Sequence, residues 1–440
     1  MQIVIIGAGY VGLVSGVCLA DIGAHVTCVD IDAGRVERLK NGLVPIYEPG
    51  LEEKLKSNLA AGRLSFDADP AEPVAVADMV FIAVGTPTRE GSGEANLDYV
   101  FAAVNDIAPH LRAGTVLVVK STVPVGTCRR IAAMVSAARP DLDFSIGSNP
   151  EFLREGKAIE DFMHPDRLVF GGSDERAANR LTALYRPLID AGVPHIATSL
   201  ENAELIKYAS NAFLALKVTY INEIANLCER IEGGDAQVIA RGIGLDSRIG
   251  PKFLAPGPGI GGSCFPKDSR AFVEIGKAVD RRQRLIEEVI TINESRKDEV
   301  ARKVLELLGE TTGKTVAVLG IAFKPETDDI REAPSLVIIP RLQAAGISVR
   351  AHDPEAMAPA RRVLDEVVWF DDPVAAAQGA DLLVILTEWQ HYREMDLRRI
   401  ADAMKTPLVF DTRLMFSATE IAGSGLLYHS LGRPTFDGRR

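Results

Sequence analysis

The chain has 440 residues, of which 49 are basic and 60 acidic, and its formal net charge is −11. This length predicts two or three domains, and the acidic balance argues against nucleic acid or anionic lipid as a partner. No apolar run is long enough to cross a bilayer, and because Met1–Ile6 already has a strand pattern, we expect no signal or transit peptide. The five cysteines are scattered without a CxxC pair, and the seven histidines show no metal-ligand spacing with them. We therefore expect no disulfide framework, no metal and a reducing, cytoplasmic location.

A short strand, a glycine-rich turn and an apolar helix begin the chain. The strand Gln2–Ile6 precedes the turn, the helical pattern reaches about Asp21, and a second strand, His25–Val29, ends at Asp30. Such a turn lets the backbone approach a pyrophosphate at the positive end of a helix, and the acid can bind the ribose 2′-hydroxyl of NAD. Arg35 would tolerate the 2′-phosphate of NADP, so NADP stays open as an alternative. The candidate cofactor residues here are Gly7, Gly9, Tyr10, Val11, Gly12, Asp30 and Arg35.

Polar residues follow two further predicted strands. Met79–Val84 leads into Gly85–Thr88, and Val116–Val119 leads into Lys120–Pro124. Strand ends of this kind line the ligand crevice of an open parallel sheet, although hydroxyls such as that of Thr86 also cap helices. The next polar patch, Asn149–Gly156, either orients a polar ligand or forms a salt-bridged turn.

A long helix is predicted from Glu201 to about Glu232, where Gly233-Gly234 should end it. Apolar residues lie nearly all the way round it, which predicts burial on most faces and a homodimer interface. Lys207 and Asn211 lie one turn apart on this helix. The lysine either extends to solvent or serves a site.

The segment Gly257–Asp268 is so rich in glycine and proline that we predict a shaped loop. Cys264 lies within it, followed by Lys267 and Asp268. A neighbouring ammonium favours the nucleophilic thiolate, so a reactive cysteine is one interpretation. An incidental small cysteine in a turn is the other.

The α/β pattern returns after about Gly313. Four strands are predicted in this half of the chain, at Val316–Gly320, Val349–Asp353, Ala380–Thr387 and Leu408–Asp411. The turn after Gly320 has no dinucleotide fingerprint, which indicates a different, nucleotide-bearing ligand. Lys324 and Arg331 would contact its phosphates or a cofactor, or are ordinary solvated charges.

The predicted fold class is α/β, with two Rossmann-like doubly wound parallel-sheet domains joined by a long central helix and a helical region. The predicted domains are an NAD-binding domain at 1–200, a central helical domain at 201–300 and, at 313–440, a Rossmann-like domain for the nucleotide-bearing ligand.

Six segments resemble the nucleotide-sugar 6-dehydrogenases over nearly the whole chain. These segments are GAGYVG at 7–12, VGTPT at 84–88, STVPVGT at 121–127, NPEFLREG at 149–156, GGSCFPKD at 261–268 and FKPETDDIREAPS at 323–335. The resemblance implies a four-electron, NAD-dependent oxidation of UDP-glucose to UDP-glucuronate. It further implies a thiohemiacetal and then a thioester on Cys264.

The resemblance also implies residue roles. Beside the nucleophile Cys264, the matching catalytic positions are Lys207, Asn211, Asp268, Glu151 and Thr122. Further cofactor contacts match Thr86, Thr122, Glu155, Lys267 and Arg331. Substrate contacts match Glu151, Phe152, Leu153, Arg154, Glu155, Lys207, Asn211, Phe253, Leu254, Ala255, Pro256, Gly257, Gly261 and Lys324. Whether Asp268 or Glu151 is the general base stays open.

Two positions bear on the substrate. Ser263 and Lys267 follow the pattern of the UDP-glucose enzymes, whereas relatives acting on UDP-N-acetylmannosamine carry GGHC and lack the lysine. Ile260 stands where UDP-glucose enzymes commonly have an aromatic residue, which keeps GDP-mannose as the alternative substrate. Two other classes also remain: a one-step hydroxyacid dehydrogenase, which would not need Cys264, and a non-catalytic NAD-sensing protein.

Overall fold

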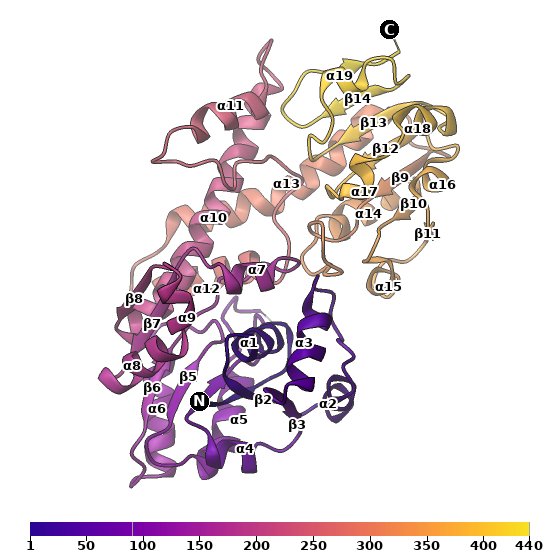
Figure 1. Cartoon of the computed structure of the whole chain (residues 1–440). Coiled ribbons are helices and arrows are strands. Elements are labelled where there is room, and N and C mark those ends of the chain that lie inside the picture. The colour runs from indigo at the N-terminus through magenta and orange to yellow at the C-terminus, as the bar shows by residue number, and fades with distance from the viewer. Residues whose placement is uncertain (90, 440) are drawn as a thin grey trace. The chain divides into compact units, whose positions relative to one another are not determined.

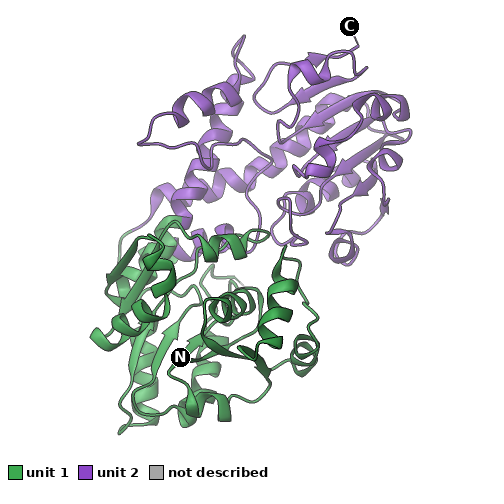
Figure 2. Cartoon of the chain, in the orientation of Figure 1, with its two compact units in different colours: residues 1–210, 274–281 green, residues 211–273, 282–440 purple. Residues whose placement is uncertain are grey.

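The computed structural model describes residues 1–89 and 91–439. They form two compact units, one of residues 1–210 and 274–281 and the other of residues 211–273 and 282–440 (Figure 2). Position 440, the last residue of the predicted C-terminal domain, lies outside the described residues.

The first unit is built on a mostly parallel sheet. Among its described residues the sheet has eight strands in the order β3-β2-β1-β4-β5-β6-β7-β8, and only the β6–β7 pair is antiparallel (Figure 1). The strands are β1 (Gln2–Ile6), β2 (His25–Val29), β3 (Leu64–Asp67), β4 (Met79–Ile82), β5 (Val116–Val119), β6 (Ser145–Ser148), β7 (Leu168–Gly172) and β8 (His195–Thr198).

Apolar side chains of this sheet alternate between two cores because successive strand residues point to opposite faces. Ile3 and Ile5 pack with α1, α2, α3, α7 and α8, whereas Val4 and Ile6 pack with α4, α5 and α6. The helices of this unit are α1 (Tyr10–Asp21), α2 (Ala33–Lys40), α3 (Leu51–Ala60), α4 (Ala71–Val76), α5 (Asp98–Ile107), the 3₁₀ helix η1 (Ala108–His110), α6 (Thr127–Ala138), α7 (Ala158–Met163), α8 (Glu175–Leu184) and α9 (Arg186–Asp190).

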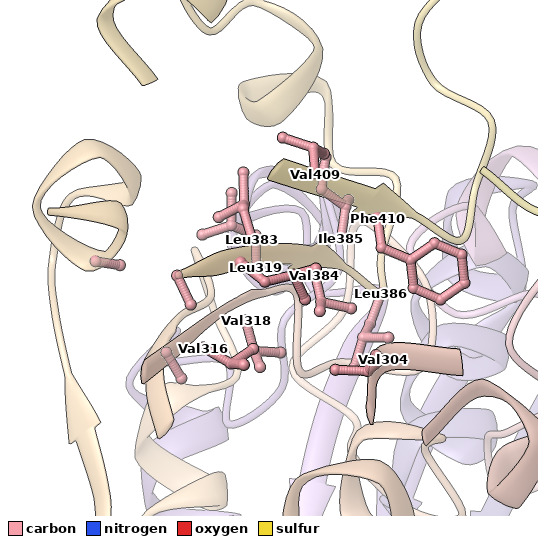
Figure 3. Close-up of a cluster of buried hydrophobic side chains, with 14 of the residues drawn as sticks. Val304, Val316, Val318, Leu319, Leu383, Val384, Ile385, Leu386, Val409 and Phe410 are labelled. Carbon is pink, nitrogen blue, oxygen red and sulfur yellow. The ribbon is translucent and has the colours of Figure 1, made fainter. Parts of the chain in front are cut away.

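The second unit contains another mostly parallel sheet. Its described strands follow the order β11-β10-β9-β12-β13-β14-β15, with only the β14–β15 pair antiparallel. Side chains of β9, β12 and β13 belong to one buried apolar cluster, which also includes Val304 of α13 (Figure 3). The strands are β9 (Thr315–Leu319), β10 (Ser348–His352), β11 (Val367–Trp369), β12 (Leu382–Ile385), β13 (Leu408–Asp411), β14 (Leu427–Ser430) and β15 (Phe436–Asp437).

Long helices lie between the two sheets in the sequence, and short ones connect the strands of the second sheet. The long helix α10 contributes residues to both units, as does α12. These helices are α10 (Leu200–Cys228), α11 (Ala236–Gly244), α12 (Phe265–Ala278), α13 (Arg284–Leu308), α14 (Ser335–Ala344), α15 (Met357–Ala360), α16 (Pro373–Ala377), α17 (Gln390–Arg393), α18 (Leu397–Ala403) and α19 (Ala418–Ile421).

The predicted fold class is confirmed, but two predicted boundaries are wrong. Helix α10 ends at Cys228 rather than at Glu232, because the chain folds back there and Gly234 packs against the backbone of Cys228. Residues 265–268, expected to belong to the loop, form the first turn of α12. A proline is tolerated in a first turn because the N–H it lacks has no intrahelical partner there. No helix in the described ranges is long and apolar enough to span a membrane.

Candidate active site

The glycine-rich turn after β1 is shaped by two glycines. Gly7 has a φ of +99°, and a Cβ on Gly12 would overlap the Gly7 carbonyl. Helix α1 begins directly afterwards, at Tyr10, and no described side chain caps its N-terminus. A Cβ placed on Gly9 would meet nothing within 4 Å. This uncapped helix start fits the pyrophosphate of a dinucleotide, because the first N–H groups of a helix have no intrahelical partner.

Asp30 lies at the end of β2, and its buried carboxylate is held against the glycine turn. One oxygen accepts from the Ala8 N–H at 2.8 Å and the other from the Asp32 N–H at 2.9 Å. Arg35 donates to the same carboxylate at 3.0 Å. Carboxylate oxygens have about two lone pairs each, so Asp30 retains capacity to accept from a ribose hydroxyl. The turn and this carboxylate together fit NAD.

Glu48, which the sequence analysis missed, connects α1 to the segment 149–156. The Tyr10 hydroxyl donates to Glu48, and the Glu48 carboxylate accepts from the backbone N–H of Gly156 at 2.7 Å and of Ala158 at 2.8 Å. Burial, reinforced by this carboxylate, raises the pKa of Tyr10 well above its ordinary value. A single acid in a proline-containing loop has no sequence signal that separates it from a solvated one.

The hydroxyls after β4 and β5 bond to carbonyl groups of the neighbouring strand ends. Thr86 donates to the Thr122 carbonyl at 2.9 Å, and Ser121 donates to the Val84 carbonyl at 2.7 Å. The two strand ends are thereby tied together, which positions the backbone around Thr122.

A buried ion pair joins the segment after β6 to α10. Glu151 Oε1 lies 3.1 Å from Lys207 Nζ, and the other carboxylate oxygen accepts from the Leu153 N–H at 2.6 Å. Burial alone would raise the pKa of Glu151, but Lys207, the Leu153 amide and Lys120 together lower it. Lys207 is 3% exposed, so it does not extend to solvent. Its Nζ also lies 5.3 Å from the centre of the Phe152 ring.

Other members of the segment 149–156 lie nearer the surface. Arg154 is exposed and pairs with Asp161 of α7, with its Nε 2.9 Å from one carboxylate oxygen. Leu153 and Glu155 are half-buried. The segment therefore combines a buried charged end with a more accessible one.

Cys264 directly precedes α12, in the second unit. Its carbonyl accepts the N–H of Asp268 at 2.8 Å, which is the first helical bond, and its side chain is exposed. The positive end of a helix favours a thiolate. The other four cysteines are buried, and burial raises the pKa of Cys18 and Cys28 to about 12. Cys264 is thus set apart from them both by exposure and by its place in the fold.

Asp268 brings together three of the predicted site residues within the second unit. One oxygen accepts from Lys267 Nζ at 2.6 Å and the other from the Asn211 side-chain amide at 2.7 Å. The carboxylate is 1% exposed.

The loop before Cys264 packs against the segment that follows β9. The Gly262 N–H donates to the Arg331 carbonyl at 2.8 Å, and a Cβ on Gly262 would lie 2.7 Å from the Phe323 ring. A Cβ on Gly261 would lie 2.8 Å from the side chain of Phe323. The segments 261–268 and 323–335, which are far apart in the sequence, therefore pack directly against each other.

Three helical side chains that the sequence analysis missed hold the start of this loop. Asn222 accepts from the Gly257 N–H at 2.8 Å, Arg296 donates to the Gly257 carbonyl at 3.1 Å, and Asn293 accepts from the Ile260 N–H at 2.6 Å. They occur at ordinary helix positions, which explains why no sequence pattern marks them.

The remaining predicted contacts of the second unit lie around the same loop. Phe253 has a φ of +65°, and its ring packs edge-on against Phe265 at 5.8 Å between centroids. Lys324 Nζ lies 5.5 Å from the Phe323 ring, and the exposed Arg331 donates to Asp329 at 2.8 Å. In the remainder of 253–257, Ala255 is exposed and the other residues are buried.

The predicted catalytic residues divide between the units. Thr122, Glu151 and Lys207 belong to the first, and Asn211, Cys264 and Asp268 to the second.

Three family models match the chain in succession. They are described as the NAD binding, central and UDP binding domains of the UDP-glucose/GDP-mannose dehydrogenase family, and they match residues 1–189, 201–295 and 317–418.

Known proteins match over almost the entire chain. A UDP-glucose 6-dehydrogenase of Rhizobium meliloti (strain 1021) is 51% identical, covering 99% of this chain and all of the relative. The UDP-glucose 6-dehydrogenase YwqF of Bacillus subtilis (strain 168) is 47% identical, covering 98% of each chain. The solved structure of a UDP-glucose dehydrogenase from Pyrobaculum islandicum superposes with a TM-score of 0.89 at 41% identity, covering 95% of each chain. The chain therefore belongs to the UDP-glucose/GDP-mannose dehydrogenase family, and it is an oxidoreductase that uses NAD as its cofactor.

Proposed function

We propose that the protein oxidises UDP-glucose to UDP-glucuronate, consuming two NAD and one water. The observation that carries this proposal is the exposed Cys264 at the start of α12, because a one-step alcohol oxidation needs no such nucleophile. The identity of 51% and 47% to relatives named as UDP-glucose 6-dehydrogenases supports the choice of sugar nucleotide.

The proposed chemistry depends on retaining the carbon between two oxidations. When bound, NAD accepts a hydride from that carbon at each oxidation. The thiolate of Cys264 adds to the aldehyde carbon and forms a thiohemiacetal, which prevents the aldehyde from escaping. Loss of the second hydride leaves a thioester on Cys264, and water cleaves the thioester to release the acid and restore the thiol.

Four polar residues serve these steps in the proposal. Lys207, when protonated, stabilises the oxyanion that develops on the substrate. The lowered pKa of Glu151 keeps its carboxylate ionised at neutral pH, so Glu151 is one candidate base. Asp268 is the other candidate base, and Asn211 orients it through the hydrogen bond between them.

We also propose roles for the three predicted domains. Residues 1–200 bind NAD, with Asp30 accepting from the adenosine ribose. Residues 201–300 carry the nucleophile and the dimer contact. Residues 313–440 bind the nucleotide of the substrate, with Lys324 as a phosphate contact.

GDP-mannose remains the second candidate substrate because of Ile260. Its side chain is buried in a small cluster with Ala215 and Val289. Isoleucine at position 260, in place of the common aromatic residue, therefore packs against α10 and α13. We keep UDP-glucose as the preferred substrate.

A homodimer is proposed from the surface of α10. Phe213, Tyr220 and Leu227 recur at intervals of seven along this helix and are 60%, 49% and 57% exposed. Such a stripe of large apolar side chains is typical of an interface. We also keep the prediction of a cytoplasmic location, which rests on cysteine usage.

The first test counts NADH. Purified protein supplied with excess NAD and limiting UDP-glucose should form two NADH per sugar nucleotide, measured by absorbance and by chromatography of the product. GDP-mannose and UDP-N-acetylmannosamine, assayed side by side, should react far more slowly. One NADH per substrate would indicate a one-step dehydrogenase, and no NADH with any nucleotide sugar would indicate a sensor.

The second test replaces Cys264 with serine. A hydroxyl is a weaker nucleophile than a thiolate, and its oxygen ester hydrolyses more slowly than a thioester. Cys264→Ser should therefore form up to two NADH per active site and then nearly stop. Peptide mass spectrometry should find a glucuronyl nucleotide on residue 264. The control Cys228→Ser changes a buried cysteine and should turn over normally; steady turnover of Cys264→Ser at the parent rate would refute covalent catalysis.

The third test concerns Asp30. Removing the carboxylate deletes a hydrogen bond to a charged group, worth about 1.5–3 kcal/mol, so Asp30→Ala should raise the Michaelis constant for NAD by roughly ten- to a hundredfold. Discrimination against NADP should narrow, while binding of UDP-glucose alone should change little. Asp106→Ala, at an exposed position of α5, is the matched control. An unchanged dependence on NAD in a folded Asp30→Ala variant would remove Asp30 from the cofactor site.

The fourth test concerns assembly. Analytical ultracentrifugation at micromolar concentration should show a dimer of the 47.4 kDa chain, and Tyr220→Arg should shift it toward monomer because a charge replaces interface surface. Val368→Arg, at an exposed position of β11, is the control. A fully active monomeric parent would contradict the dimer.

A further inference from the structure

A second buried lysine lies near the Glu151–Lys207 pair. Lys120 follows β5 and is 3% exposed. Its ammonium donates to the side-chain oxygen of Asn149 at 3.1 Å and to the Asn149 carbonyl at 3.3 Å. No carboxylate among the described residues forms an ion pair with it. Burying an ammonium between neutral acceptors lowers the stability of the fold. Packing alone therefore gives no reason for a lysine at position 120.

Asn149 connects this lysine to the proposed catalytic pair. The Tyr185 hydroxyl donates to the same Asn149 oxygen at 2.7 Å, and the Asn149 amide donates to the Val169 carbonyl at 3.1 Å. Asn149 is thereby fixed by three other elements, and Glu151 follows it after a single proline. The position of the Glu151 carboxylate, 3.1 Å from Lys207, thus depends on a backbone that Lys120 holds.

The charges around Lys120 favour an electrostatic effect on Glu151. Burial lowers the pKa of Lys120 to about 8, with Glu151 acting to raise it and Lys207 to lower it. Conversely, both ammonium groups lower the pKa of Glu151. Lys120 and Glu151 line the same pocket, and its other titratable lining residues are Asp161, Arg167 and Tyr185. Arg167 stacks on the Phe152 ring at 3.5 Å.

We propose that Lys120 is a positioning residue for the oxidation: its ammonium fixes Asn149, and its charge lies in the pocket that Lys120 and Glu151 both line, near the Glu151–Lys207 pair. This inference rests on the proposed function only for the role of Glu151 in turnover. The structural effect on Glu151 is independent of it.

The experiment compares the pH dependence of kcat in the parent with that of Lys120→Met and Lys120→Arg. Loss of a nearby cation raises a carboxylate pKa, so in Lys120→Met the acid limb should move to higher pH by about one unit. Lys120→Arg keeps the positive charge. The acid limb of its pH profile should therefore lie at the same pH as in the parent, including where kcat itself is reduced. Tyr185→Phe removes a neutral donor from Asn149 and should leave the limb unmoved.

A second readout needs no turnover. Infrared difference spectra against Glu151→Gln report the protonated carboxyl group of Glu151, which should appear at a higher pH in Lys120→Met than in the parent. An unmoved Glu151 titration overturns the proposal, as does a loss of kcat that is equal at every pH. If Lys120→Met fails to fold, Asn149→Asp places an anion against Lys120 and should move the same titration in the same direction. Absence of UDP-glucose oxidation by the parent would defeat the proposed function and leave the infrared test of Lys120 intact.

Discussion

The Cys264 loop takes its shape from a backbone approach that only glycine permits. At Gly262 the chain runs so close to Phe323 that a Cβ would overlap the ring, and the same residue donates its N–H to the Arg331 carbonyl. Two residues after this contact comes Cys264, and α12 begins directly after it. The thiol therefore lies at the positive end of a helix. The chemistry of the nucleophile therefore depends on a contact with a segment some sixty positions further along the chain.

The two sheets show how one topology supports different uses. Asp30 and Asp353 follow equivalent strands, and each accepts from the turn after the neighbouring strand. Asp353 also accepts from the N–H groups of Glu355 and Ala356 and from the Trp389 indole. A carboxylate so fully engaged is structural, since its lone pairs are occupied. Asp30 has fewer partners, and its turn leaves a helix start open for phosphate.

Several of the buried charges belong to residues with proposed chemical roles. Glu151 is paired with Lys207, and Asp268 with Lys267. The side chains of Glu151, Lys207 and Asp268 are buried, and that of Lys267 is 17% exposed. Such pairs add little net stability compared with apolar packing. The desolvation cost of these pairs has a reason in the proposed chemistry. A preformed polar environment stabilises the charge that develops on a substrate without having to reorganise. Glu48 and Asn149 are further polar residues near this pair, and they hold the segment 149–156 that carries Glu151. Glu48 accepts from the Gly156 N–H, and Asn149 accepts from Lys120.

Local patterns in the sequence were enough to predict the α/β class and strands such as Gln2–Ile6 and Leu408–Asp411, and to mark Cys264 as a candidate nucleophile. Strand periodicity and glycine-rich turns are properties of neighbouring residues, so they can be read without the fold. Glu48, Asn222 and Asn293 could not be identified in this way. Each holds a segment that is distant in the sequence, and no local pattern marks its position. The end of α10 was mispredicted for the same reason: Gly234 packs against Cys228, and a chain reversal of this kind is settled by tertiary contacts rather than by local propensity.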